Sequence, residues 1–136
     1  MFSALDISTS ALVAQRTNIE VIAGNIANKD VTRDAAGNSI PYRRRVAMFA
    51  TGAEDGGPGV RVAEVIADPT EFRTRWAPDH PDAIKDGPER GYLRESNVSY
   101  HSEMVNAMTA MRAYEANVTV MEVAKSMAAT TLRLIG

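Results

Sequence analysis

The stretch MRAYEANVTVMEVAKSMAATTLRLIG, residues 111–136, decides the fold, because it has no proline and no glycine before its last residue. It predicts the larger part of one long helix that begins between Asn97 and Ser102. Residues recur at seven-residue spacing along a first line, which Lys125 interrupts: Met104, Met111, Val118 and Leu132. A second line has the same spacing: Ala107, Tyr114, Met121, Ala128 and Ile135. Two such lines are typical of a coiled-coil seam.

A second long helix is predicted near the amino terminus. Apolar residues with the same spacing define its buried side: Leu5, Leu12, Ile19 and Ile26, with Ile22 in the companion position. Asn28 marks its expected end. At ~1.5 Å per residue this helix is about 39 Å long and the carboxy-terminal one about 51 Å. The longer helix therefore has apolar surface left over, and we expect that surface to meet other chains.

The middle of the chain cannot form long helices. All six prolines and seven of the nine glycines lie between residues 37 and 91, and both residue types disfavour helix interiors. Residues 46–49, 60–66 and 71–76 are short β-rich runs. We therefore predict a mainly α fold with paired, coiled-coil-like terminal helices and a small β-rich insert facing outward. Its three parts are an amino-terminal helix (1–31), a β-rich middle with loops (32–97) and a carboxy-terminal helix (98–136).

Composition excludes several classes of function. A net charge of −2 gives no sign of binding to nucleic acid or to an anionic membrane. The absence of cysteine removes disulfides and thiolate metal sites. No run approaches the ~18 apolar residues of a membrane span. Asp6, Arg16 and Glu20 interrupt the first apolar segment, which is unlike a classical signal peptide.

Two clusters of polar residues are candidate sites. Asp79, His80 and Asp82 in APDHPDA (77–83) could offer mixed metal ligands, but no further ligand follows at a motif spacing. The segment is more typical of a stiff, extended loop, and a small metal-dependent enzyme remains an alternative. The arginine run 43–45 predicts a solvated strand face. With no catalytic, metal or cofactor motif, we expect neither an enzyme nor a small-molecule binder.

Two terminal segments carry a resemblance to a known family. SALDISTSALVAQRTNIEVIAGNIAN (3–28) and RAYEANVTVMEVAKSMAATTLRL (112–134) resemble the paired ends of the flagellar axial proteins, which are rod, hook and filament-junction subunits. Three middle segments resemble the short, proximal-rod members: GNSIPYRRRVAMFA (37–50), ADPTEFRTRWAPDHPDA (67–83) and GYLRESNV (91–98). The loops 54–59 and 84–90 depart from that pattern.

The resemblance implies a structural subunit of the bacterial flagellar basal body. Such subunits stack helically in the periplasm with copies of themselves and other rod proteins, and they transmit torque from motor to hook. They leave the cytoplasm through the flagellar type III export apparatus and its basal adaptor, without a cleaved signal. In the family signature, residues 25–28 match the amino-terminal part and residues 112–117 its carboxy-terminal counterpart.

Together, the two heptad patterns and the resemblance predict a subunit interface. Its residues are Leu5, Leu12, Ile19, Ile22, Asn25, Ile26, Asn28, Met104, Met111, Arg112, Tyr114, Glu115, Asn117, Val118, Met121, Leu132 and Ile135. The alternative from another class is a soluble coiled-coil adaptor or export chaperone. That protein would be a stable cytosolic dimer, whereas a rod subunit should be monomeric until it meets its neighbours.

Overall fold

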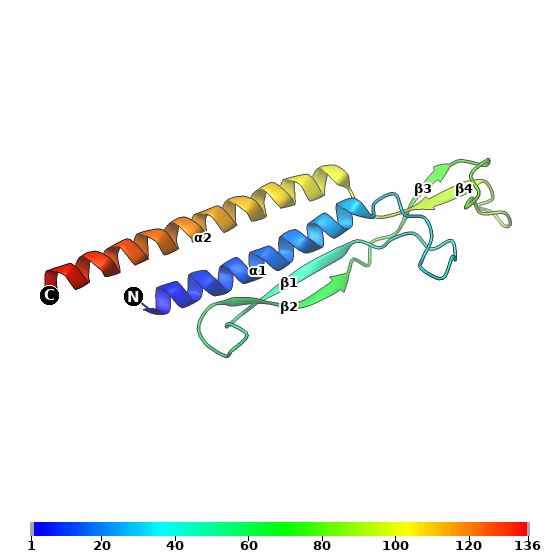
Figure 1. Ribbon diagram of the computed structural model, residues 1–136. Helices are drawn as coiled ribbons and strands as arrows, with labels where there is room; N and C mark the ends of the chain where they lie inside the picture. The colour runs from blue at the N-terminus through cyan, green and yellow to red at the C-terminus, as the bar shows by residue number, and fades with distance from the viewer. Residues whose placement is uncertain (1, 136) are drawn as a thin grey trace.

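The computed structural model describes residues 2–135 and contains two long helices and four short strands (Figure 1). In chain order they are α1 (Phe2–Ala27), β1 (Arg45–Thr51), β2 (Val60–Ala67), β3 (Arg73–Trp76), β4 (Tyr92–Glu95) and α2 (Tyr100–Ile135). The helices run antiparallel beside each other (Figure 1), which confirms the predicted pair of terminal helices. Their 26 and 36 residues make up less than half of the 136-residue chain. The description "mainly α" therefore overstates the helix content.

The strands form two separate antiparallel hairpins. β1 pairs with β2 from Arg45 opposite Ala67 to Thr51 opposite Val60, with an irregularity between Met48 and Phe49. β3 pairs with β4 beyond the end of the helix pair (Figure 1). A two-stranded hairpin is marginally stable alone, and β1–β2 packs along α1. Since β1–β2 makes no comparable contact with α2, α1 lies between the hairpin and α2.

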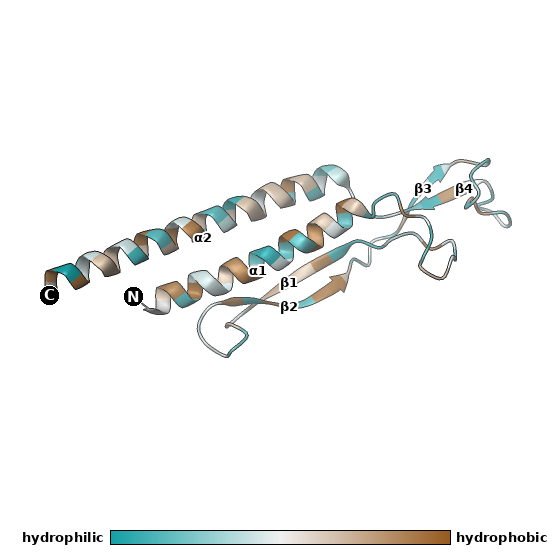
Figure 2. Ribbon diagram, in the orientation of Figure 1, coloured by the Kyte–Doolittle hydropathy of each residue, from teal (hydrophilic) through white to brown (hydrophobic). Residues whose placement is uncertain are grey.

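The core is small for a chain of this length. Its buried apolar residues are Ala14, Ile22, Ala47, Ala83, Leu93, Val98 and Ala110. Apolar residues are instead spread along both helices and the β1–β2 hairpin (Figure 2). Within residues 2–135, neither helix is long and apolar enough to cross a membrane. Much of the apolar surface of this chain thus lies outside its own core.

The tip of the β1–β2 hairpin touches α1 at one serine. The backbone N–H of Val60 donates to Ser10 Oγ at 3.1 Å, and Ser10 Oγ donates to the carbonyl of Ile7 at 2.7 Å. Gly59 has a φ of +144°, and a Cβ at this position would lie 2.1 Å from Ser10 Oγ. Glycine at position 59 therefore allows the hairpin to lie directly on the helix.

Two glycine-to-alanine variants should change stability in opposite directions. Gly59→Ala is expected to lower the free energy of unfolding by roughly 1–3 kcal/mol, through backbone strain and the clash with Ser10. Gly24→Ala adds a methyl group that meets nothing within 4 Å inside α1, and should raise it by about 0.5–1 kcal/mol. Urea unfolding of both purified variants is the measurement. Equal effects would show that the hairpin does not rest on Ser10.

Candidate functional site

α2 turns a face of mostly small residues toward α1. Its positions that are not exposed are Glu103, Ala107, Ala110, Ala113, Asn117, Val118, Met121, Ala124 and Ala128. Alanine at such positions lets two helix axes approach closely. Ala107, Met121 and Ala128 of the second predicted heptad line are among these positions, whereas Tyr114 of that line and most of the first line are exposed. Met104, Met111 and Leu132 of that first line are 39%, 52% and 72% accessible.

The two helices do not end at the same level, because α2 is longer than α1. Asn25 of α1 hydrogen-bonds to Glu103 of α2, which fixes the register of the two antiparallel helices. Because both rise ~1.5 Å per residue, Phe2 lies opposite about residue 126, and α2 continues about 13 Å further. Figure 1 shows the carboxy-terminal end of α2 projecting past the start of α1. We call residues 127–135 the overhang.

Asn25, near the end of α1, is fully buried and makes four hydrogen bonds. Its Nδ2 donates to the carbonyl of Arg45 at 2.8 Å and to Glu103 Oε2 at 2.9 Å. Its Oδ1 accepts from the N–H of Arg45 at 2.9 Å and from the Tyr42 hydroxyl at 3.0 Å. Both amide protons and the amide oxygen are therefore used. One side chain holds α1 to β1 and to α2.

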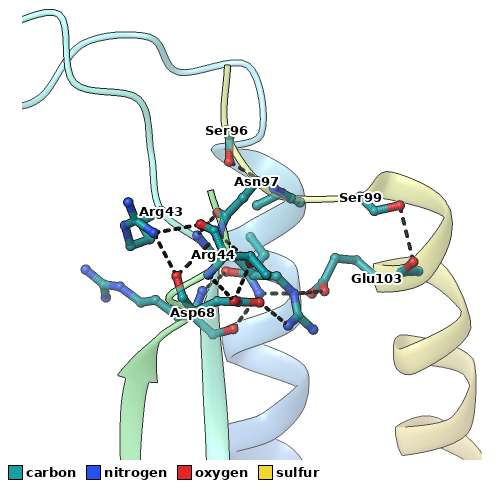
Figure 3. A network of polar contacts seen from close by, with 12 residues as sticks. Arg43, Arg44, Asp68, Ser96, Asn97, Ser99 and Glu103 are labelled. Carbon is teal, nitrogen blue, oxygen red and sulfur yellow. Dashed lines mark hydrogen bonds and ion pairs between the residues drawn. The ribbon is translucent and has the colours of Figure 1, made fainter. Parts of the chain in front are cut away.

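Glu103, in the first turn of α2, is a fully buried carboxylate. Its Oε1 accepts a hydrogen bond from Arg44 Nε at 2.7 Å, and Arg44 Nη1 reaches Asp68 Oδ2 at 3.0 Å (Figure 3). A buried charge is tolerated only when it is paired and hydrogen-bonded. Arg44 supplies that pairing, and it joins the start of α2 to the segment after β2.

Asp68 and Asn97 complete this cluster. Asp68 Oδ1 accepts hydrogen bonds from the N–H and the hydroxyl of Thr70. These bonds and the ion pair with Arg44 lower the pKa of Asp68 to about 2. Asn97 Oδ1 accepts from the N–H of Arg44 at 2.8 Å, and its Nδ2 donates to the carbonyl of Thr70 at 3.1 Å. We call Asn25, Arg44, Asp68, Asn97 and Glu103 the polar junction.

Comparison with known proteins identifies the family. Residues 5–33 match the family described as "Flagella basal body rod protein", and residues 89–134 match "Flagellar basal body rod FlgEFG protein C-terminal". The chain is 36% identical to the flagellar basal-body rod protein FlgC of Borreliella burgdorferi, over 99% of this chain and 97% of that protein. It is 34% identical to FlgC of Bacillus subtilis and 39% identical to FlgC of Yersinia enterocolitica, in both cases over 98% of this chain and 97% of the relative. The chain belongs to the FlgC family.

Membership of the FlgC family confirms the resemblance seen in the terminal segments. FlgC proteins are flagellar basal-body rod proteins, so this chain is a structural subunit of the rod and not an enzyme. It is located in the basal-body rod and assembles there with other basal-body components. Membership of this family favours the rod subunit over the alternative of a coiled-coil adaptor or export chaperone.

The predicted interface residues of this FlgC-family chain fall into three groups. The exposed ones are Met104, Met111, Arg112, Tyr114, Glu115 and Leu132. The half-buried ones are Leu5, Leu12, Ile19, Ile26, Asn28, Asn117, Val118 and Met121. Ile22 and Asn25 are buried within the chain. The side chain of Ile135 lies outside the described part of the structure.

The prediction for the arginine run was wrong. Only Arg45 of the three arginines is exposed and within a strand. Arg44 belongs to the polar junction. Arg43 donates to the carbonyls of Asp68 and Thr70 at 2.9 Å, and its guanidinium lies 4.2 Å from the centre of the Phe72 ring. The run holds segments of the chain together, because its neighbours supply buried acceptors that the local sequence does not reveal.

The segment APDHPDA forms successive turns and not the extended loop that we expected. Asp82 accepts hydrogen bonds from Arg33 Nε at 2.5 Å and from the Thr32 hydroxyl at 2.7 Å, and these bonds lower its pKa. His80 Nδ1 accepts the N–H of Asp82 at 3.1 Å. No group of three potential metal ligands occurs among residues 2–135. The segment thus attaches the β3–β4 region to the chain that follows α1.

The polar junction was missed by sequence reasoning, apart from Asn25. Its hydrogen bonds join residues as far as 78 positions apart, and such pairs leave no periodic pattern. One signal was available: Glu103 has heptad spacing with Ala110, Asn117 and Ala124. A carboxylate on a line of small residues indicates a buried charge with a distant partner.

Removal of the Asp68 charge should lower the free energy of unfolding at neutral pH and should lower it much less in acid. The folded-state pKa of about 2 lies below the ordinary aspartate value of 3.8, so this charge stabilises the fold fully above about pH 4 and progressively less toward pH 2. The gap in unfolding free energy between wild type and Asp68→Asn should therefore shrink over that window. Urea unfolding of both proteins at about pH 7, 4 and 2.5 measures it. A gap that does not change with pH would contradict the lowered pKa of Asp68 in the folded chain.

Proposed function

We propose that this chain assembles helically with copies of itself and with other rod proteins in the periplasmic rod, and that the assembly transmits torque from motor to hook. The observation that carries the proposal is the apolar surface that α2 leaves uncovered. Val105, Met108 and Met111 are 62%, 53% and 52% accessible, and Leu134 in the overhang is 82% accessible. Exposed apolar surface of this extent is typical of a binding face.

The proposed interface consists of the exposed and half-buried members of the predicted set. Met104 and Met111 lie on the uncovered side of α2, and Leu132 lies past the start of α1. Methionine packs well against irregular partners, which suits contacts with several kinds of rod protein. Ile22 and Asn25 have a different part in this proposal, because they hold α1 in place inside each subunit.

The polar junction supports the transmission of torque. It joins α1, β1, the segment after β2 and α2 through hydrogen bonds and ion pairs. Fully satisfied buried networks make a fold rigid. A load applied to one helix therefore passes to the other elements at this end, with little change in their arrangement.

Export without a cleaved signal, through the flagellar export apparatus and its basal adaptor, is also part of the proposal. Its support is that the amino-terminal residues form α1, which packs against both α2 and the β1–β2 hairpin. Asp6, Arg16 and Glu20 also interrupt the apolar residues of this helix, unlike the continuous apolar core of a cleaved signal.

Deletion of the gene tests the proposed function. We expect cells without it to stop swimming and to yield basal bodies that lack a rod. Restoring the gene should restore both the rod and swimming. The purified chain should be a monomer by light scattering. Swimming cells with complete rods after the deletion would overturn the proposal.

A further inference from the structure

A groove lies between α1 and β2, on the side of α1 away from α2. It has a volume of about 620 Å³. Its apolar lining includes Val13 and Ala14 from α1 and Val60, Val62 and Val65 from β2. Ser10 also lines the groove, and the hydrogen bond that its Oγ accepts from the N–H of Val60 holds the hairpin tip on the helix. The groove is thus a built feature of the fold.

The rim of the groove is acidic. Its charged residues are Asp6, Glu54, Asp55, Glu64 and Arg61. Arg61 is engaged with the carbonyls of Thr51 and Gly52, and no ion pair within residues 2–135 involves any of the four carboxylates. The groove therefore suits an occupant with an apolar face and positively charged flanks.

α2 has a face with these properties. Val120, Val123, Met127 and Leu134 share it, since they follow at spacings of three, four and seven residues. They are 49%, 54%, 58% and 82% accessible. Glu122 lies beside Val123, but residues 123–135 contain two cations, Lys125 and Arg133, and no carboxylate. Arg133, beside Leu134, is a cation that makes no ion pair within residues 2–135.

The groove and this face also match in length. The α1 wall of the groove runs from Asp6 to Thr17, about 17 Å at ~1.5 Å per residue, and the face from Val120 to Leu134 is about 21 Å long. A chain cannot fill its own groove, because its α2 lies on the opposite side of α1 (Figure 1). The occupant must come from another molecule.

We propose that the Val120–Leu134 face of α2 in one copy of this chain occupies the α1–β2 groove of the next copy. This inference rests on the proposed helical assembly and names the contact that propagates it. The two surfaces are different parts of the chain, so the contact is head-to-tail and leaves a free groove at one end and a free α2 at the other. Such contacts build open helical stacks unless the rotation closes a ring.

The chain has no cysteine, so cross-linking between two introduced cysteines tests the contact directly. Basal bodies are isolated from cells whose chain carries Val13→Cys and Met127→Cys, and are treated with a short bis-maleimide. We expect bands at twice the mass of the chain and at higher multiples, because every copy carries both cysteines and the contact is head-to-tail. The control pair, Met48→Cys with Met127→Cys, replaces Val13 (54% accessible) by Met48 (46%), which lies outside the groove lining, and should give less than a tenth of that product. Thr17→Cys with Thr130→Cys replaces the first pair if that pair does not assemble.

The outcomes separate the two proposals. Three results would overturn the groove contact while the chain is still present in the rod. They are a product that joins the chain to a different rod protein, equal products from the test and control pairs, and no product from either groove pair. Absence of the chain from isolated basal bodies would instead overturn the proposed function.

Discussion

Deletion of residues 127–136 is expected to abolish swimming while leaving the isolated chain folded. The deleted segment projects past the start of α1, and Leu132 and Leu134 are 72% and 82% accessible. The monomer therefore loses few of its own contacts. In the proposed assembly each leucine becomes a buried contact, and loss of such a side chain costs about 2–5 kcal/mol. The loss recurs in every copy.

Swimming in soft agar and circular dichroism of the purified protein are the two measurements. The double variant Leu132→Ala, Leu134→Ala should reproduce the loss of swimming. Ser126→Ala, at an exposed position directly before the overhang and off the Val120–Leu134 face, serves as the control and should swim normally. Normal swimming of the truncated protein would mean that the overhang takes no part in assembly.

Glu103→Ala, unlike the deletion of residues 127–136, should destabilise the fold of the isolated chain. The substitution leaves Arg44 without its buried partner and Asn25 Nδ2 without one of its two acceptors. Breaking a buried ion pair on one side costs roughly 3–5 kcal/mol, which is a large part of the stability of a typical domain. We expect a clearly lower urea midpoint and loss of helical signal.

Glu122→Ala is the matched control, because Glu122 is an exposed carboxylate on the same helix. Its effect should stay within about 0.5 kcal/mol, as for most surface positions. The double variant Arg44→Met, Glu103→Leu removes both charges and should be less destabilised than Glu103→Ala. Equal stability of Glu103→Ala and Glu122→Ala would show that the polar junction does not hold the helices together.

The helices could be predicted from the sequence because their signals are local. Prolines and glycines confine long helices to the two ends, and heptad spacing marks the side of each that packs. The spacing could not tell which of the two lines on α2 faces α1. The answer depends on size, since small residues such as Ala110 permit close packing and the larger Met104 and Met111 lie outside. Only the partner surface decides this.

The hairpins and the polar junction were harder to predict for a related reason. β4 has only four residues and lacks a clear alternating pattern. Arg44 looked like part of a solvated run, yet its partners Asp68 and Glu103 come from elsewhere in the chain. Charge pairs at long separation are specified by the tertiary fold. Local sequence gives each charge but not its partner.

The polar junction and the face of small residues that α2 turns toward α1 also give the helix pair a mechanical character. α2 is held at one end by charged and amide groups and packs against α1 through its small residues along the middle. Its other end projects past α1. This is the arrangement of a cantilever. Bending of its free end changes few contacts inside the subunit, whereas displacement at the held end would break an ion pair and several hydrogen bonds. One subunit can thus meet neighbours at slightly different angles with its compliant tip and still carry load through its stiff base.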